Sequence, residues 1–263
     1  MKNDVVFSLI KSMTQSEKRY FRRYSSLHSE QKDNNYVQLF DRMESMKNYD
    51  ESALAKKIAN KHFAQLKRHL LIKLLESLRA FNKARGIENN LHHLISNHYV
   101  LKDKGINKQS KKELYKAKQL SSQTERHYDL IKTMQIETIV LREEKDLEAL
   151  EKHLTELQNI LSNSIKALEN ELSYEQIYIS MVKWNKEIEF ARNKTEQHQL
   201  DKILQQDILS DESKALSSKS NIYFHYIKGL YYFFSGNFES SALHFEKQWL
   251  LFRQHPHNIE ENK

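Results

Sequence analysis

Apolar residues recur every three or four positions along most of this 263-residue chain, which is the spacing of amphipathic α-helices. The strongest example runs from Phe63 to Phe81, where eight apolar side chains share one helical face ahead of Gly86. Four shorter helices are expected before it, over residues 5–13, 14–27, 36–46 and 54–58. Thr14 and Glu17 have the spacing of an N-terminal capping box. The pattern therefore predicts an all-α protein.

From residue 87 onward the helices are expected to pair across short polar turns. Four antiparallel hairpins are predicted, over residues 91–104 with 107–120, 128–142 with 146–161, 168–192 with 196–209, and 220–234 with 238–254. The polar stretch from Leu161 to Ser164 is interpreted as the turn that separates the second hairpin from the third. We therefore expect two domains: a basic N-terminal helical module, residues 1–86, and a helical-repeat domain, residues 87–263.

A second interpretation exists for the leucines between residues 147 and 168. Six of them occupy a and d positions of a heptad frame, with Ser164 at the one vacant d position: Leu147, Leu150, Leu154, Leu157, Leu161 and Leu168. Such a frame is typical of a coiled coil, but a helix in the core of a solenoid shows almost the same stripe. We favour core packing and keep the coiled coil as the alternative.

Two of the four glycines in the chain lie seven residues apart near its end, as Gly229 and Gly236. The pattern around them continues through Tyr232, Phe238, Ser241, Ala242 and Phe245 and is followed by Pro256. With this pattern, residues 220–256 resemble one unit of the tetratricopeptide repeat family. The resemblance implies a right-handed α-solenoid of antiparallel helical hairpins, in which the earlier hairpins are degenerate repeats. It does not extend over residues 1–86.

The resemblance also implies structural roles within this last hairpin. Gly229 would lie where its two helices approach closely, and Gly236 at the turn between them, where positive φ is accessible. The aromatic members Tyr232, Phe238 and Phe245 would fill space within and between repeats. Ser241 would keep the crossing of the two helices small.

A solenoid of this kind implies a scaffold that holds a peptide or protein partner in a concave groove. The candidate contacts on the first helix of the last hairpin are Tyr223, His225, Tyr226 and Lys228. No polar capping helix is expected after this hairpin, which would leave its apolar residues exposed, among them Phe233, Phe234, Trp249, Leu250 and Phe252. We therefore expect either self-association through the C-terminal repeat or that the chain is part of a longer repeat protein.

Charge supplies an alternative function for the N-terminal module. The net charge of +7 divides unevenly, with 25 basic and 13 acidic residues over positions 1–125 and 17 and 22 over positions 126–263. The candidate nucleic-acid contacts are Lys18, Arg19, Arg22 and Arg23, supported on the long helix by Lys67, Arg68, Lys73, Arg79, Lys83 and Arg85. The layout is similar to that of bacterial regulators that join a DNA-binding helix-turn-helix to tetratricopeptide repeats. A solvated lysine-rich helix surface is the simpler explanation.

Composition bears on localisation and chemistry. The absence of cysteine suits a reducing compartment, and no apolar run reaches the length of a membrane span, so we expect a cytoplasmic protein that does not contact membranes. There is no Gly-x-Ser-x-Gly, no phosphate-binding glycine loop and no His-Glu-x-x-His among the thirteen histidines. We therefore expect no catalytic residue, no metal site and no cofactor.

Overall fold

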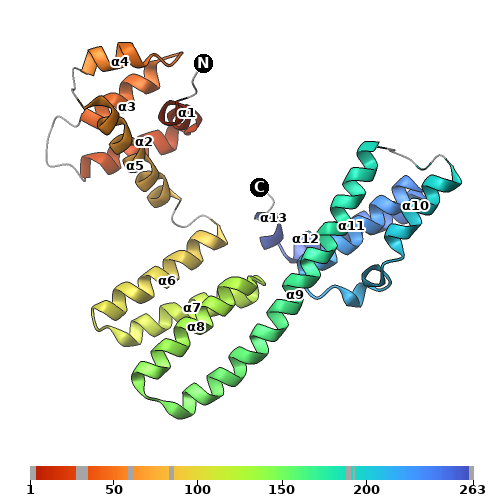
Figure 1. Ribbon diagram of the computed structural model, residues 1–263. Helices are drawn as coiled ribbons and strands as arrows, with labels where there is room; N and C mark the ends of the chain where they lie inside the picture. Colours follow the sequence, from red (N-terminus) through yellow and green to blue (C-terminus); the bar gives the residue numbers. More distant parts are fainter. Residues whose placement is uncertain are drawn as a thin grey trace. The chain divides into compact units, whose positions relative to one another are not determined.

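The computed structural model describes residues 4–27, 35–58, 62–82, 86–187, 191 and 193–260 (Figure 1). Every regular element within these ranges is helical, which confirms the all-α fold class. The chain divides into two compact units, Met1–Arg85 and Gly86–Lys263, and each unit has a hydrophobic core of its own.

Unit 1 contains five helices around a single core. They are α1 (Val5–Ser12), α2 (Gln15–Leu27), α3 (Asn35–Ser45), α4 (Glu51–Ile58) and α5 (Phe63–Phe81). The long helix α5 packs against α2 and α3, and its Leu74 is fully buried with Phe21 of α2 and Phe40 of α3. The capping box is present at the start of α2. The Thr14 amide donates to Glu17 Oε2 at 2.7 Å, and the Glu17 amide donates to Thr14 Oγ1 at 3.3 Å.

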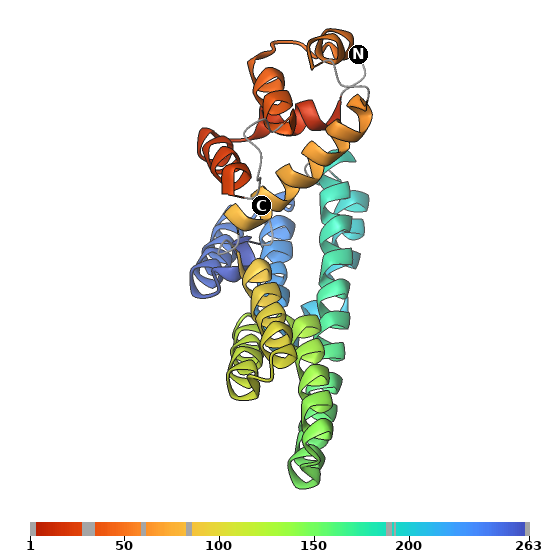
Figure 2. The same cartoon turned by 90° about the vertical axis from the view of Figure 1, so that its left-hand side faces the viewer.

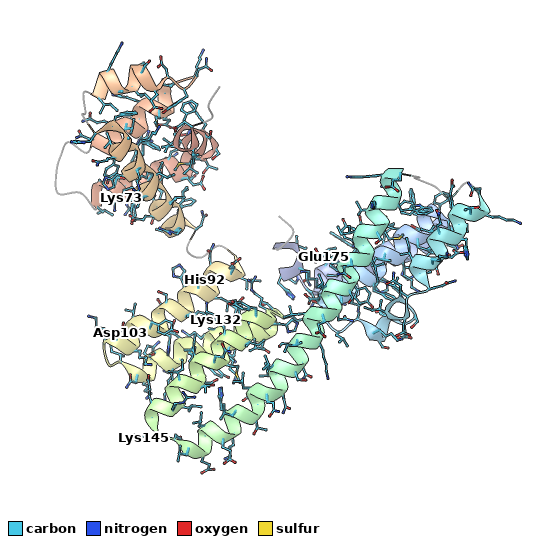
Figure 3. All side chains as sticks on the ribbon, in the orientation of Figure 1. Lys73, His92, Asp103, Lys132, Lys145 and Glu175 are labelled. Carbon is cyan, nitrogen blue, oxygen red and sulfur yellow. The ribbon has the colours of Figure 1, made fainter. Side chains whose placement is uncertain are left out.

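Unit 2 is built mainly from helix pairs. Its elements are α6 (Ile87–Asp103), α7 (Asn107–Gln123), α8 (His127–Glu144), α9 (Leu147–Glu187), α10 (Lys194–Leu204), the 3-10 turns η1 (Asp207–Leu209) and η2 (Glu212–Lys214), α11 (Ser218–Phe234), α12 (Phe238–Gln254) and α13 (His257–Glu260). The pairs α6/α7, α8/α9 and α11/α12 pack closely. Gly105 and Gly236 adopt positive φ in two of the connecting turns, and Lys145, labelled in Figure 3, does so in the third.

The predicted turn at Leu161–Ser164 is wrong, because α9 is one continuous helix of 41 residues (Figure 1). The segment contains neither glycine nor proline, and serine and asparagine each lower helix stability by only about half a kcal/mol relative to alanine. Packing overrides that small preference. The N-terminal part of α9 packs against α8, its C-terminal part packs against α11, and Ser164 is buried between exposed neighbours.

The predicted third hairpin is also wrong. Its first helix belongs to α9, which ends at Glu187, and Arg192 lies outside the described residues. Its second helix corresponds to the shorter α10, which packs against α11. Within the described residues of unit 2, three hairpins are therefore present where four were predicted.

Candidate functional site

The four residues predicted to line a groove lie on α11, which packs against both α9 and α12. His225 is only 1% exposed, so its proposed contact with a partner is corrected. Its Nε2 lies 3.3 Å from Glu212 Oε1, and its Nδ1 lies 2.9 Å from His244 Nδ1. The helical pattern placed His225 on the right helix but could not show that α12 covers it.

The other three groove residues are partly buried. Tyr223 and Tyr226 both pack against Tyr178 of α9, with ring centroids 5.5 and 5.4 Å apart. Lys228 Nζ lies 5.2 Å from the centroid of the Phe224 ring, and burial lowers the pKa of this lysine. The two tyrosines line a cavity of about 190 Å³ whose walls also include Tyr178, Lys219, Ile222, Gln248, Phe252 and Asn258. The predicted groove is thus a small aromatic cavity.

The glycine and serine of the last hairpin lie at its helix crossing. A Cβ atom on Gly229 would be 2.8 Å from Phe245 Cε1, closer than Cβ contacts allow, and Ser241 Oγ donates to the Gly229 carbonyl at 2.9 Å. The Tyr232 ring stacks on His244 at 5.5 Å. Phe238 was expected to fill space, but it is 59% exposed at the first position of α12.

The apolar C-terminal face is only partly open. Phe234, expected to be at risk of exposure, is buried in the core with α9 and α11 residues. Trp249 and Leu250 are exposed on α12. The short helix α13 follows, and its Asn258 is buried and donates to Ser218 Oγ at 2.9 Å. The short helix α13 therefore packs back onto the start of α11.

The pair formed by His225 and His244 makes unit 2 sensitive to acid. Burial, with the neighbouring His225 as the next cause, lowers the pKa of His244 to about 4, and burial also lowers the pKa of His225. Only one of the two Nδ1 atoms can be protonated in this contact, because two N–H groups pointing at each other would repel. A second proton on the pair is therefore unfavourable in the folded state.

We expect the free energy of unfolding to be highest above about pH 6.5 and to fall as the pH decreases toward about 4. The unfolded histidines bind protons near pH 6.5, whereas folded His244 does so only near pH 4. The expected loss is about 1–2 kcal/mol, allowing for solvent screening.

Urea unfolding followed by circular dichroism from pH 7.5 to 4.5 would measure this loss. His244→Gln should flatten the profile, whereas the exposed His198→Gln should not, and equal slopes for all three proteins would contradict this origin.

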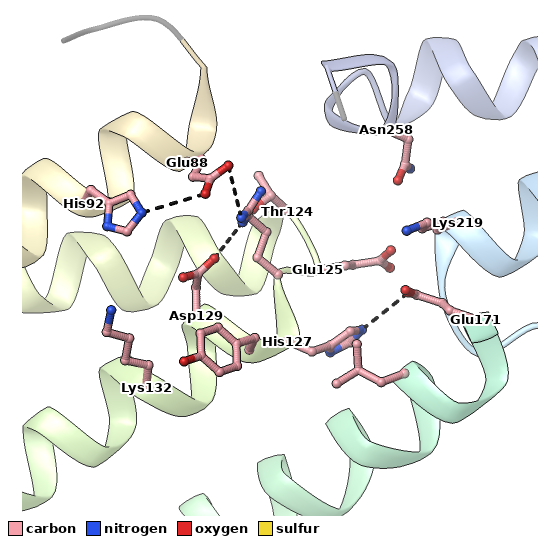
Figure 4. A pocket seen from close by; sticks show the side chains of 13 residues that line it. Glu88, His92, Thr124, Glu125, His127, Asp129, Lys132, Glu171, Lys219 and Asn258 are labelled. Atoms are coloured by element: carbon pink, nitrogen blue, oxygen red, sulfur yellow. Dashed lines mark hydrogen bonds and ion pairs between the residues drawn. The ribbon is translucent and has the colours of Figure 1, made fainter. Parts of the chain in front are cut away.

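A polar cleft of about 320 Å³ lies elsewhere in unit 2 (Figure 4). Its walls come from the start of α6, the α7–α8 turn, α8, α9, α11 and α13. The lining residues are Glu88, His92, Thr124, Glu125, Arg126, His127, Tyr128, Asp129, Lys132, Leu168, Glu171, Lys219 and Asn258. The sequence analysis missed this cleft because its walls come from segments up to 170 residues apart.

Acidic groups of the cleft bind neighbouring groups of the protein. Arg126 Nε lies 2.7 Å from Asp129 Oδ2, and Arg126 Nη2 lies 4.0 Å from Glu88 Oε2. Glu125, at φ 53°, accepts a hydrogen bond from the Ser218 amide at 2.8 Å and another from the Ser218 hydroxyl. This carboxylate therefore caps α11 from the α7–α8 turn, 93 residues away. These contacts hold the α7–α8 turn against the start of α11.

The four basic candidates on α2 differ in their surroundings. Lys18 is buried, with Nζ 3.6 Å from Glu44 Oε1. Arg22 is paired with Asp41 at 2.9 Å and with Glu44. Arg19 and Arg23 are exposed. Two of the four charges are thus already neutralised within unit 1, and the nucleic-acid hypothesis depends on the other two.

The basic residues proposed on α5 add little support to the nucleic-acid hypothesis. Lys67 binds Asp4 at 2.9 Å, and Lys73 binds Glu76 at 2.8 Å. Arg68 and Arg79 are exposed. Lys83 and Arg85 lie outside the described residues.

A row of exposed apolar residues runs along α9, and we call it the α9 stripe. Its seven members are all at least 39% exposed: Leu147, Leu154, Leu161, Ile165, Leu168, Leu172 and Ile179. Four of the six leucines that were expected to fill a core are exposed members of this stripe, so the expectation is wrong for them: Leu147, Leu154, Leu161 and Leu168. The core side of α9 is formed instead by other residues, among them His153, Ala167, Tyr174 and Met181.

The stripe is straight and narrow. At 100° per residue its members fall within a sector of about 60° over about 48 Å of helix. The heptad frame identified from the sequence misses Ile165, Leu172 and Ile179, because they lie four residues after its a positions and the frame places its second apolar column three residues after them. The wider set could have been found by also testing the four-residue spacing.

No family model, no curated protein and no solved structure matches this chain. The tetratricopeptide resemblance therefore depends on the residues of the α11/α12 hairpin alone. Among the described helices, none is long and apolar enough to cross a membrane. Within the same part of the chain, no three His, Asp or Glu side chains are grouped so that they could hold a metal ion.

Proposed function

We propose that this protein is a non-enzymatic scaffold of helical hairpins that binds an α-helical protein partner along the α9 stripe. The observation that supports the proposal is the stripe itself. Single exposed apolar side chains are common on protein surfaces, but seven leucines and isoleucines in a line on one long helix resemble the seam of a helix-in-groove or coiled-coil contact. A tetratricopeptide-like solenoid remains our proposal for the finer fold.

The energetics favour a partner that also presents an apolar face. Full burial of a leucine or isoleucine is worth roughly 2 kcal/mol, and the stripe residues are already about half buried, so each adds roughly 1 kcal/mol. Seven together give roughly 7 kcal/mol, which only matches the usual cost of association of about 4–15 kcal/mol. A helix with a matching stripe roughly doubles the gain. We therefore expect the partner to carry such a helix.

This proposal moves the binding surface from α11 to α9. His225 is enclosed by α12 and Glu212, and the tyrosines beside it pack on Tyr178 of α9. The α9 stripe, by contrast, is exposed, whereas α8 and α11 pack on the face of α9 that carries His153 and Tyr174. A partner can reach this surface without any movement of the hairpins.

Photocrosslinking in the native host would test the proposal. Leu172 is replaced by p-benzoylphenylalanine, and the matched control carries the same group at Lys166, which is exposed on α9 about 120° from Leu172. We expect a covalent protein adduct from position 172 and much less from position 166. Equal labelling at both positions, or none at 172, would remove the support for the stripe as a binding surface.

A further inference from the structure

The spacing of the α9 stripe has a symmetry. From Leu147 to Ile179 the intervals between successive members are 7, 7, 4, 3, 4 and 7 residues. The last five of them read the same in both directions. Such a stripe matches a copy of itself that runs antiparallel, and it is the self-complementary surface that a two-fold contact needs.

We infer that the helical partner of α9 is the α9 of a second copy of this chain, in an antiparallel two-fold pair; the inference rests on the proposed function. The two-fold axis passes the helix between Lys166 and Ala167. It brings Ile165 opposite Leu168 of the second copy. Moving outward, Leu161 meets Leu172 of the second copy, and Leu154 meets Ile179 of the second copy. Each pair occurs twice, so the six central stripe residues of both chains are buried.

Charge supports the same direction and register. Glu151 and Lys183 are exposed on the same flank of the stripe and, within the described chain, neither makes an ion pair. In the antiparallel register, Glu151 lies within one residue of the position opposite Lys183 of the second copy. By the two-fold symmetry, Lys183 and Glu151 of the second copy form the same pair at the other end of the contact. Opposite charges flanking an apolar seam set the orientation of paired helices.

A parallel pair is disfavoured by the same residues. It would place Glu175 beside Glu175 of the second copy, because this residue continues the apolar spacing between Leu172 and Ile179. Figure 3 labels Glu175 on the C-terminal half of α9. In the antiparallel register this glutamate meets Leu157 and Gln158 of the second copy. Two like charges at a helix seam are destabilising, so the antiparallel pair avoids a repulsion that the parallel pair contains.

Helix geometry also permits the contact. The stripe members lie in two columns of seven-residue spacing, four residues apart, and the use of the second column after Leu161 keeps the stripe within about 60° on one side of the helix. In Figure 2 the long green-to-teal helix α9 runs along one edge of unit 2. Its closest neighbours in unit 2, α8 and α11, pack on the face that carries His153 and Tyr174.

Light scattering coupled to size-exclusion chromatography on the full chain tests the pair. We expect twice the chain mass of 31.5 kDa at protein concentrations up to about 100 μM. Leu161→Asp with Leu172→Asp should raise the dissociation constant at least about 100-fold without loss of helical circular dichroism. Val100→Asp, at an exposed apolar residue of α6, is the matched control and should remain dimeric. A monomeric parent protein with intact helicity would overturn the inference.

The chain contains no cysteine, so engineered disulfides can report the direction of the pair. The double variant Leu154→Cys/Ile179→Cys should form a disulfide-linked dimer on oxidation. Each single variant should not, because two copies of the same position lie about 37 Å apart in the antiparallel register. Within one chain the two cysteines are equally far apart and cannot join. Efficient crosslinking of a single variant would show a parallel pair and overturn the antiparallel geometry.

The outcomes separate this inference from the proposed function. A photocrosslinked adduct at position 172 with the mass of two chains supports both. An adduct with a different protein, together with a monomeric chain, overturns the two-fold pair and leaves α9 as a binding surface. Absence of any adduct, with a monomeric chain, removes both.

Discussion

Asn163→Pro is expected to lower the free energy of unfolding of unit 2 by about 3 kcal/mol or more. Asn163 is exposed at the seventeenth position of α9, so its side chain contributes little packing. Proline at this position removes the amide that would bond to the carbonyl of Asn159, and its ring collides with that carbonyl. The kink would also separate the half of α9 that packs on α8 from the half that packs on α11. Urea unfolding followed by circular dichroism measures the loss.

A matched control is available at the start of α10. Lys194 is exposed and is the first residue of that helix, after the N-cap Asn193 in an extended conformation. Proline is well tolerated at such a position, because the first helical amide has no partner within the helix. Lys194→Pro should therefore change stability by less than about 0.5 kcal/mol. If Asn163→Pro were equally mild, residues 161–164 would form a turn and the continuous α9 would be wrong.

The long helix shows where local sequence signals are insufficient. Serine and asparagine at residues 162–164 favour caps and turns through side-chain hydrogen bonds to the backbone, so a turn was the natural prediction. The preference amounts to tenths of a kcal/mol per residue, whereas helix packing on α8 and α11 is worth far more. Glycine and proline are the strongest helix breakers, and neither occurs between Leu147 and Glu187.

Local patterns predicted the unit 1 helices well. The first and last apolar residues of the pattern, Phe63 and Phe81, are also the first and last residues of α5, and the Thr14–Glu17 spacing predicted the start of α2. These features depend on residues within a few turns of one another, which the sequence displays directly. The candidate sites depend on contacts between distant residues. Glu125 and Ser218 are 93 positions apart, and nothing in either neighbourhood indicates that they meet.

Exposure was the other quantity that the sequence could not supply. A leucine stripe at helical spacing describes a core face and a docking face equally well. In α9 a buried face and an exposed apolar face adjoin on one helix, with His153 buried and the next residue, Leu154, exposed. The polar residue lies inside because its Nε2 is 2.9 Å from the Met134 carbonyl oxygen and 3.1 Å from Thr138 Oγ1 of α8, and only the tertiary structure shows those partners.

The second large effect is expected at Gly229, where Gly229→Leu should destabilise unit 2 by about 2–3 kcal/mol. Even a Cβ atom would lie 2.8 Å from Phe245 Cε1 and 3.0 Å from two more atoms of that ring. The ring cannot easily move away, because it also contacts Tyr226, with centroids 5.9 Å apart. The larger side chain must therefore push α12 away from α11 or displace the aromatic cluster.

A double-mutant cycle identifies the ring as the cause. Phe245→Ala removes the obstruction, at a cost of its own, and leaves room for a leucine at position 229. The double variant Gly229→Leu/Phe245→Ala should be more stable than the sum of the two single losses predicts, by at least about 1 kcal/mol. Urea unfolding of the four proteins gives this coupling energy. A coupling near zero would mean that Phe245 does not set the need for glycine, and the close approach of α11 and α12 would then require another explanation.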